Sequence, residues 1–176
     1  MKIIGIDPGK SNGGVAIYDE PTKTWTLARQ PDEDQWKEIF QEWADLGQGV
    51  LVAIEKQMIR REDQGSPAFF GLQKLVAQTE RMTATLRALG VPYVEIYAIS
   101  WTASWRLPKG KKESKDARKK RYQILAQELV GRKVALWGSD AVLLAHFIQK
   151  KRFEDPAWIQ ERIVNGDENR HIFTEQ

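Results

Sequence analysis

The residues that this sequence lacks limit the chemistry open to it. Its 176 residues include no cysteine, which excludes disulfide bonds and a thiolate zinc site and favours a reducing cytoplasm. Histidine occurs only at His146 and His171, too few for a histidine-rich metal centre. We therefore expect any bound metal to be a hard cation held by oxygen atoms.

Long apolar runs are also missing. No stretch approaches the roughly 20 apolar residues that a membrane-spanning helix needs, and the apolar start of the chain meets a charge at Asp7, too early for a signal peptide. The length suits one full-sized core. We expect a single domain over residues 1–165 with a frayed tail over 166–176, and neither a membrane nor a small organic cofactor as partner.

The positive charge is concentrated in one segment. Between Lys109 and Arg121, eight basic residues stand against Glu113 and Asp116, a local charge of +6, so the net charge of +3 leaves about −3 for the rest. A concentrated basic patch on a slightly acidic chain is typical of a protein that binds a polyanion. A solvated helix face explains such a run equally well.

Turn-rich segments divide the first half of the chain into short elements. Three apolar runs with turns between them predict an antiparallel meander: Lys2–Asp7, Val15–Asp19 and Trp25–Arg29. Pro31-Asp32 opens a predicted helix that carries Trp36, Ile39, Phe40 and Trp43 at helical spacing and closes near Gly47. The continuous run Val50–Glu55 suits a strand that is buried on both faces.

Helical signals dominate the second half. Ser66-Pro67 is typical of a helix start, and apolar residues recur at helical spacing from Leu72 to Leu89. We predict a strand over Val91–Ile99 and a loop over Trp101–Lys111. Ser114 is expected to cap a basic helix that runs to about Val130, and a last helix covers Asp140–Lys151. The order βββ-α-β-α-β-α-α indicates an α/β fold.

Two of the predicted strands end in an acid. Because a helical crossover leads to Val50–Glu55, this strand should run parallel to a meander strand. If that neighbour is Lys2–Asp7, Asp7 and Glu55 end at the same sheet edge, about 5 Å apart, where one divalent cation could bridge them. Taken singly, Asp7 can also begin a turn, Glu55 can reach solvent, and Asp140 can complement a helix dipole.

Short motifs follow one another in a specific order. They are Gly-Ile-Asp-Pro-Gly at 5–9, Ile-Glu-Lys-Gln at 54–57, the helix from Pro67, Ser-Trp-Arg at 104–106, Lys-Glu-Ser at 112–114 and Ser-Asp-Ala-Val-Leu-Leu-Ala at 139–145. This order resembles the RuvC-like Holliday-junction resolvases of the RNase H-like superfamily, especially phage and related bacterial branches. The resemblance implies a central five-stranded mixed sheet flanked by helices.

The resemblance also implies a function and a partner. It makes Asp7, Glu55 and Asp140 ligands of Mg²⁺, for which Mn²⁺ can substitute, in a homodimer that nicks two symmetric strands of a four-way DNA junction. The helix Pro67–Leu89 would supply part of the dimer contact; a plain core helix is the alternative. Met58 is an apolar side chain that could help to open the junction; the alternative is that it is simply packed against its neighbours.

The implied chemistry is two-metal phosphodiester hydrolysis, with the ions about 4 Å apart. Lys112 or Lys115 would place a positive charge at the phosphate, and the sequence does not choose between them. The residues expected to neutralise phosphates of the junction arms are Lys109, Lys111, Lys112, Lys115, Arg118, Lys119 and Arg121.

One departure from the family pattern bears on the site. A fourth ligand, Asp or His, usually stands about three residues before the equivalent of Asp140, and here that position is Trp137. His146 is expected to be packed or at the surface. An RNase H-like nuclease of other specificity (flaps, branched DNA, RNA–DNA hybrid), or a branched-DNA binder without catalysis, is therefore the alternative. The class of actin-like ATPases is not supported, because the sequence lacks the second phosphate loop that these proteins need.

Overall fold

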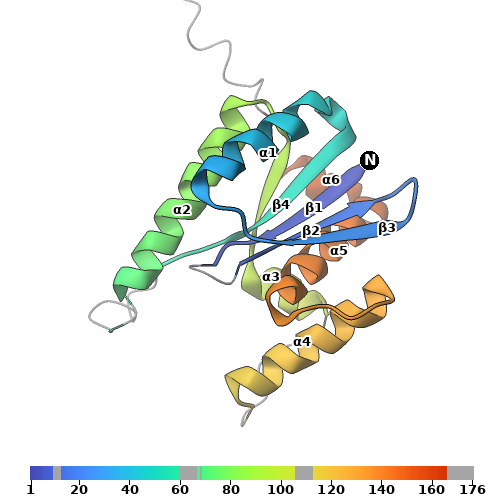
Figure 1. The fold of residues 1–176 in the computed structure, drawn as a ribbon. Helices are drawn as coiled ribbons and strands as arrows, with labels where there is room; N and C mark the ends of the chain where they lie inside the picture. The colour runs from blue at the N-terminus through green and yellow to red at the C-terminus, as the bar shows by residue number, and fades with distance from the viewer. Residues whose placement is uncertain (10–12, 60–66, 68, 106–112, 166–176) are drawn as a thin grey trace, which may run out of the picture.

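The computed structural model describes residues 1–9, 13–59, 67, 69–105 and 113–165. A mixed five-stranded sheet of order β3-β2-β1-β4-β5 forms the centre. Helices α1 and α2 cover one face of the sheet, and α5, with α3, α4 and α6 beside it, covers the other (Figure 1). This is the five-stranded mixed sheet, flanked by helices, that the sequence predicts.

The predicted meander is present. Strands β1 (Lys2–Asp7), β2 (Gly14–Asp19) and β3 (Thr24–Arg29) pair in antiparallel order. Their bounds agree with the predicted runs to within one residue, because turn signals flank each run. In this register Asp7 pairs with Gly14 at the end of the β1–β2 ladder.

Helix α1 (Glu33–Asp45) begins with a capping box. The backbone N–H of Gln35 donates to Asp32 Oδ1 at 3.0 Å, and the Gln35 side chain accepts from the Asp32 backbone at 3.2 Å. The helix buries an aromatic face made of Trp36, Phe40 and Trp43 against the sheet. A short 3-10 helix, η1 (Gly47–Gly49), then leads into the next strand.

Strand β4 (Val50–Lys56) runs parallel to β1, with Ile54 opposite Ile6. Helix α2 (Phe69–Ala88) follows and leads to β5 (Tyr93–Tyr97), which is parallel to β4. The parallel pairing of β1 with β4 confirms the topology expected from the helical crossover. Ser66, the predicted cap of α2, lies outside the described residues.

The segment after β5 differs from the prediction. Residues 98 and 99, expected in a strand, and residues 101–104, expected in a loop, form helix α3 (Ala98–Ser104). Trp101 explains the difference, since it is 1 % exposed in the core. Its burial favours a helix where local propensity is weak.

The C-terminal third is helical. It contains α4 (Lys115–Val130), the 3-10 helix η3 (Leu136–Gly138), α5 (Ser139–Glu154) and α6 (Pro156–Gln160). Ser114 caps α4 as predicted, because its Oγ accepts from the backbone N–H of Ala117 at 3.1 Å. Helix α5 extends three residues past its predicted end at Lys151, and α6 was not predicted.

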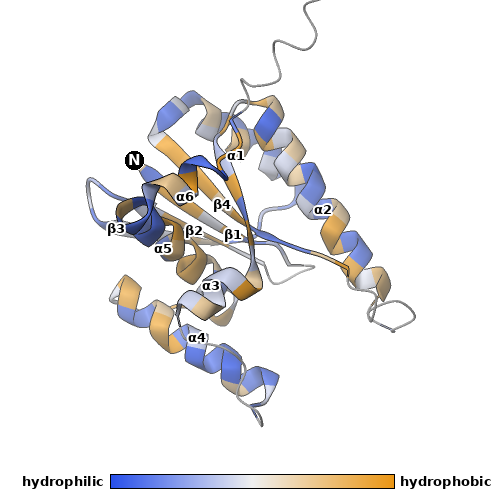
Figure 2. Ribbon diagram, turned by 180° about the vertical axis from the view of Figure 1, so that it is seen from behind, coloured by the Kyte–Doolittle hydropathy of each residue, from blue (hydrophilic) through white to orange (hydrophobic). Residues whose placement is uncertain are grey.

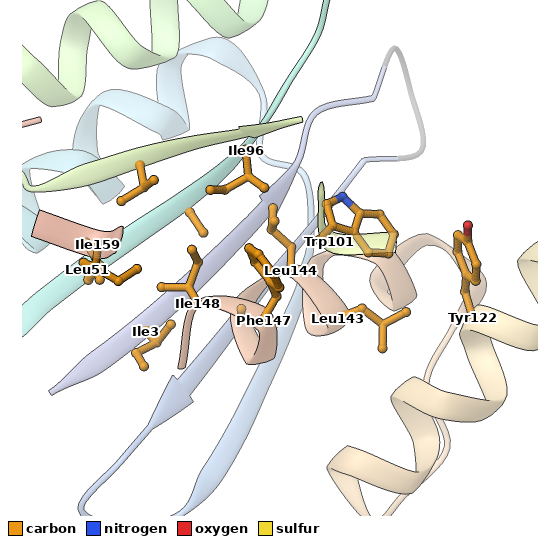
Figure 3. Packing of buried hydrophobic residues seen from close by; sticks show 13 residues of the cluster. Ile3, Leu51, Ile96, Trp101, Tyr122, Leu143, Leu144, Phe147, Ile148 and Ile159 are labelled. Carbon is orange, nitrogen blue, oxygen red and sulfur yellow. The ribbon is translucent and has the colours of Figure 1, made fainter. Parts of the chain in front are cut away.

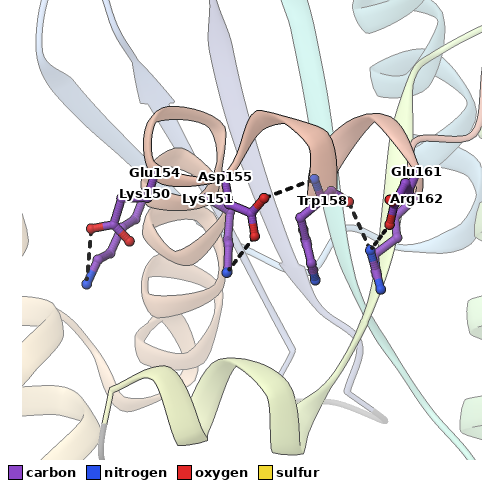
Figure 4. A network of polar contacts seen from close by, with 7 residues as sticks. All are labelled: Lys150, Lys151, Glu154, Asp155, Trp158, Glu161 and Arg162. Atoms are coloured by element: carbon purple, nitrogen blue, oxygen red, sulfur yellow. Dashed lines mark hydrogen bonds and ion pairs between the residues drawn. The ribbon is translucent and has the colours of Figure 1, made fainter.

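The corner between α5 and α6 is held by polar contacts (Figure 4). Lys151 on α5 pairs with Asp155 at 3.4 Å, and Asp155 also accepts from the backbone N–H of Trp158 at 3.3 Å. Asp155 therefore caps α6, and Pro156 follows at the first helical position, where proline is tolerated.

Apolar side chains fill both sides of the sheet. The ribbons of β1 and β4 are largely hydrophobic along their length (Figure 2). Between the sheet and α5, Ile3 and Leu51 pack with Leu144 and Ile148 (Figure 3). No helix among the described residues is both long enough and apolar enough to cross a membrane.

Gly5 in β1 brings α5 close to the sheet. A Cβ atom at this position would overlap the carbonyl oxygen of Ala141 and would come within 2.9 Å of the Ala145 nitrogen. Glycine thus allows the backbones of β1 and α5 to approach where a side chain would separate them. This close approach fixes the start of α5, where Asp140 lies, over the end of β1.

Candidate metal centre

Asp7 and Glu55 end neighbouring parallel strands. The pairing of Ile6 with Ile54 places Asp7 beside Glu55 at one edge of the sheet. Since side chains alternate along a strand, both acids face the side that carries Ile3, Leu51 and helix α5. The sequence predicted this juxtaposition for the case in which Lys2–Asp7 is the neighbour of Val50–Glu55, and the structure shows that pairing.

Asp140 joins them from α5. It lies in the first turn of the helix and is 7 % exposed. Its Oδ2 accepts a hydrogen bond from Lys119 Nζ, and its buried Oδ1 has no hydrogen-bond partner within the described part of the chain. A buried carboxylate oxygen that lacks a hydrogen-bond donor has lone pairs that can coordinate a cation.

The three acids interact electrostatically. Burial raises the pKa of Asp7 well above its ordinary value, and the negative charges of Asp140 and Glu55 raise it further. Burial also raises the pKa of Glu55, and the charge of Asp140 adds to the shift. Buried acids whose charges raise the pKa of a neighbouring acid form a site of negative potential, which a bound cation would stabilise.

Lys119 supplies the positive charge at this site. Burial acts to lower its pKa, but the hydrogen bond and the charges of Asp140, Asp7 and Glu55 together raise it above the ordinary value. The sequence assigned Lys119 to DNA phosphates and offered Lys112 or Lys115 as the lysine of the site. Lys115 lies one helical turn before Lys119, so helical spacing alone could have suggested either residue.

Two side chains hold Glu55 in place. The indole N–H of Trp101 donates to Glu55 Oε2 at 2.9 Å, and the amide of Gln57 donates to Oε1 at 3.0 Å. Each carboxylate oxygen therefore has one donor. Sequence reasoning missed Trp101 because it placed this residue in a loop; Gln57 was part of the Ile-Glu-Lys-Gln motif, but without a role.

Trp137 lies in η3, next to the start of β2. Its carbonyl oxygen is so close to Gly14 that a Cβ there would overlap it, and Gly14 pairs with Asp7. The residue thus stands near the acids without offering a side-chain ligand. His146 is half-buried on α5, with its ring centre 5.0 Å from that of Trp105, and burial lowers its pKa.

The basic segment is partly described. Lys115 is exposed, Arg118 is half-buried, and both lie on α4 with Lys119. Arg121 pairs with Glu113 at 2.8 Å. Lys109, Lys111 and Lys112, expected to contact phosphates, lie outside the described residues. Helix α4 therefore carries basic side chains at its surface as well as Lys119, which reaches Asp140.

The donor set suits a hard divalent cation. Asp7, Glu55 and Asp140 offer only oxygen atoms, as Mg²⁺ prefers, and Asp140 Oδ1 is buried without a partner among the described residues. As the described side chains stand, no three of them from Asp, Glu and His form a metal-holding group. Lys119 neutralises Asp140 instead, so cation binding requires these side chains to reorient.

The comparisons with known proteins concern the fold. RuvC from Thermus thermophilus, solved in complex with a Holliday junction substrate, superposes with a TM-score of 0.58 at 14% identity, over 88% of this chain and 97% of that chain. Another structure of Thermus thermophilus RuvC gives a TM-score of 0.47 at 15% identity, over 94% and 99%. No family profile and no curated protein matches the sequence. The likeness to the junction-bound structure shows that this chain shares its α/β fold, of the RNase H-like type.

Proposed function

We propose that this protein is a divalent-metal-dependent endodeoxyribonuclease that resolves four-way DNA junctions by paired symmetric nicks. The observation that carries the proposal is the meeting of Asp7, Glu55 and Asp140 at one sheet edge, where burial and the charge of Asp140 raise the pKa values of Asp7 and Glu55 and where Lys119 bonds to Asp140. The fold that this chain shares with a junction-bound RuvC structure supports the choice of substrate.

Each residue of the site has a part in hydrolysis. Asp7, Glu55 and Asp140 would hold Mg²⁺ or Mn²⁺, and Trp101 and Gln57 would keep Glu55 oriented toward it. When bound, the metal supplies the positive charge that activates a water molecule and stabilises the leaving oxygen. Lys119, once released from Asp140, donates to a non-bridging oxygen of the scissile phosphate.

Helix α4 supplies the surface for the DNA backbone. Lys115 and Lys120 are exposed on it, and Arg118 is half-buried. Positive side chains that track phosphates give affinity without sequence preference. Because Lys119 lies on the same helix, a backbone that follows α4 is led to the carboxylates.

A second copy of this chain is the protein partner that the proposal requires. Burial in α2 begins at Thr79, and the turns before it carry half-buried Leu72, Leu75 and Val76 together with Phe70, which is 73 % exposed. These turns extend beyond the sheet (Figure 1). An apolar helix face of this kind suits pairing between two copies, which would set two sites on one junction.

The deciding experiment compares labelled substrates side by side. A four-way junction, a linear duplex, a flap and an RNA–DNA hybrid are incubated with the protein in Mg²⁺, Mn²⁺ or EDTA. We expect cleavage of the junction in either metal, at symmetric positions, and none in EDTA. Cleavage of the flap or the hybrid in preference to the junction would show a different substrate specificity. Binding of the junction without any cleavage would exclude nuclease activity.

Substitutions then test the site. Asp7→Asn, Glu55→Gln and Asp140→Asn should each abolish cleavage while junction binding persists. Asp19→Asn is the matched control, because Asp19 also ends a strand of the same sheet but lies opposite Lys2, at the other edge. Full cleavage by any of the three site variants would exclude that residue from the site.

A further inference from the structure

A cavity of about 390 Å³ adjoins the candidate metal centre. It lies between the end of β4 and the turn from β5 into α3, and its lining residues are Glu55, Lys56, Gln57, Met58, Tyr97, Ala98 and Ile99. Glu55 therefore belongs both to the carboxylate site and to the wall of this cavity. A phosphate bound at the carboxylates would therefore lie beside this cavity.

Three large side chains of the wall expose apolar surface. Met58 is 49 % exposed, Tyr97 is 42 % exposed and Ile99 is 73 % exposed. The ribbon is hydrophobic where β5 passes into α3 (Figure 2). Large apolar side chains that gather around one cavity, instead of being scattered over the surface, mark a binding site.

Polar groups stand at defined places around this apolar wall. Lys56 Nζ lies 5.7 Å from the ring centre of Tyr97 and bonds to Glu95 at 3.2 Å. The amide of Gln57 points one donor at Glu55. The cavity thus combines an aromatic ring, aliphatic side chains and an amide, which together match a flat heterocycle with polar edges.

We propose that this cavity receives an unpaired nucleobase of the cut strand, next to the scissile phosphate, and that Tyr97 and Ile99 set the preference for that base. The inference rests on the proposed nuclease function, and it assigns specificity to the β5–α3 turn. A base that leaves its stack must regain stacking elsewhere, and the Tyr97 ring offers it beside the site. Met58, three residues after Glu55, would occupy the space that the base leaves.

The test is a cleavage series on junctions that differ only in the base pairs flanking the cut site. Tyr97→Ala should slow cleavage of the best junction about tenfold and flatten the preference among the junctions, since the base loses the aromatic ring on which it stacks. Tyr97→Phe keeps the ring and should retain both the rate and the preference. Ile99→Ala should change the preference more than the rate.

Phe153→Ala is the matched control. Phe153 is a large apolar residue that is 73 % exposed, as Ile99 is, but it lies near the end of α5, outside the cavity. Its replacement should leave both the rate and the preference unchanged. Equal loss in Phe153→Ala and Tyr97→Ala would show a general effect of lost apolar surface and would overturn the inference.

Fluorescence gives a readout that does not need cleavage. Junctions carry 2-aminopurine at one of the positions that flank the cut site, and they are bound by the inactive Asp7→Asn protein. We expect binding to change the emission at one position, and the further Tyr97→Ala substitution to remove that change. The inference fails if no position responds, or if Tyr97→Ala leaves the response, the rate and the preference as they were. Absence of any cleavage by the unaltered protein is a separate result, which counts against the nuclease itself.

Discussion

The indole N–H of Trp101 donates a hydrogen bond to Oε2 of Glu55 over 2.9 Å. Trp101 is 1 % exposed and packs against Tyr122 of α4, with ring centres 5.5 Å apart (Figure 3). One core side chain therefore touches both a carboxylate of the candidate site and the helix that carries Lys119. Packing of the core and orientation of the site are coupled through this residue.

Trp101→Phe tests that coupling. The variant keeps an aromatic ring but removes the donor to a buried carboxylate, so we expect unfolding free energy to fall by about 2 kcal/mol and cleavage to slow more than junction binding weakens. Urea unfolding and single-turnover cleavage measure the two effects. Trp36→Phe is the control: Trp36 is also buried, but its indole N–H has no partner among the described residues, so no hydrogen bond is lost. Equal stability losses in the two variants would contradict the prediction.

Lys119 should compete with a metal ion for Asp140. In Lys119→Met the buried Asp140 loses its partner, so the metal-free protein should lose about 2 kcal/mol of stability. The same change removes a positive charge from beside the carboxylates, so Mg²⁺ should bind more tightly, as calorimetric titration would measure. Cleavage at saturating Mg²⁺ should nevertheless fall about a hundredfold, because the phosphate loses a donor.

Lys120→Met is the matched control for Lys119. Lys120 is the next residue on α4 and is exposed, so its loss should leave both stability and Mg²⁺ affinity unchanged. Weaker Mg²⁺ binding by Lys119→Met than by the unaltered protein would show that the ammonium group supports the metal site instead of competing for it.

The fold followed from sequence patterns where burial and local signals agree. The sequence could place Val50–Glu55 parallel to a meander strand, because a helical crossover leads to it. The pairing of Asp7 with Glu55 depended on Lys2–Asp7 being that neighbour, as the structure has it. Helix α1 and Ser114 could be placed because capping residues stand directly before apolar or basic periodicity. Helix α3 could not, because Trp101 is helical through tertiary burial, which a local reading does not contain.

The site was less predictable than the fold. Three carboxylates could be named from motifs, but the choice among lysines depends on the rotation of α4 about its axis, which packing of Tyr122 and Ala126 fixes. Lys119, not Lys115, consequently reaches Asp140. The hydrogen bond from Trp101 to Glu55 joins residues 46 positions apart, and no single-sequence pattern encodes such a contact.

The salt dependence of DNA binding tests helix α4. Replacing Lys115, Arg118 and Lys120 together by glutamine should weaken junction binding and reduce the slope of log K against log salt by about 0.9 for each phosphate that is no longer neutralised. The control replaces Lys23, Lys37 and Lys150, which are exposed and lie off α4, with the same total change in charge. Equal slopes for the two triple variants would show that net charge, and not the face of α4, attracts the DNA.

Gly5→Ala should damage the junction of β1 with α5. The new Cβ would overlap the Ala141 carbonyl oxygen, a backbone atom that cannot rotate away, so we expect a loss of about 1–3 kcal/mol or more in urea unfolding. Gly71→Ala is the same substitution inside α2, where nothing lies within 4 Å of the new Cβ, and it should stabilise by about 0.5–1 kcal/mol. Destabilisation in both variants alike would remove the steric explanation.

His146 should make the protein less stable in mild acid. Burial lowers the pKa of its imidazole below the ordinary value, and the positive charge of Lys150 lowers it further. The unfolded chain therefore takes up this proton at a higher pH than the folded chain, so stability is lost as pH falls below about 6.5. His146→Phe keeps an aromatic ring beside Trp105 but has no imidazole to protonate, so it should not lose this stability in mild acid.

The comparison that isolates His146 is the stability difference between the two proteins, measured by urea unfolding from pH 7.5 to pH 5. The raised pKa values of Asp7 and Glu55 act in the opposite direction, since folded acids that hold protons more tightly gain stability as pH falls. Both proteins contain these acids, so their effect cancels in the difference. The unfolding free energy of His146→Phe, relative to that of the unaltered protein, should rise steadily as the pH falls. A difference that stays constant with pH would exclude His146 as the group responsible.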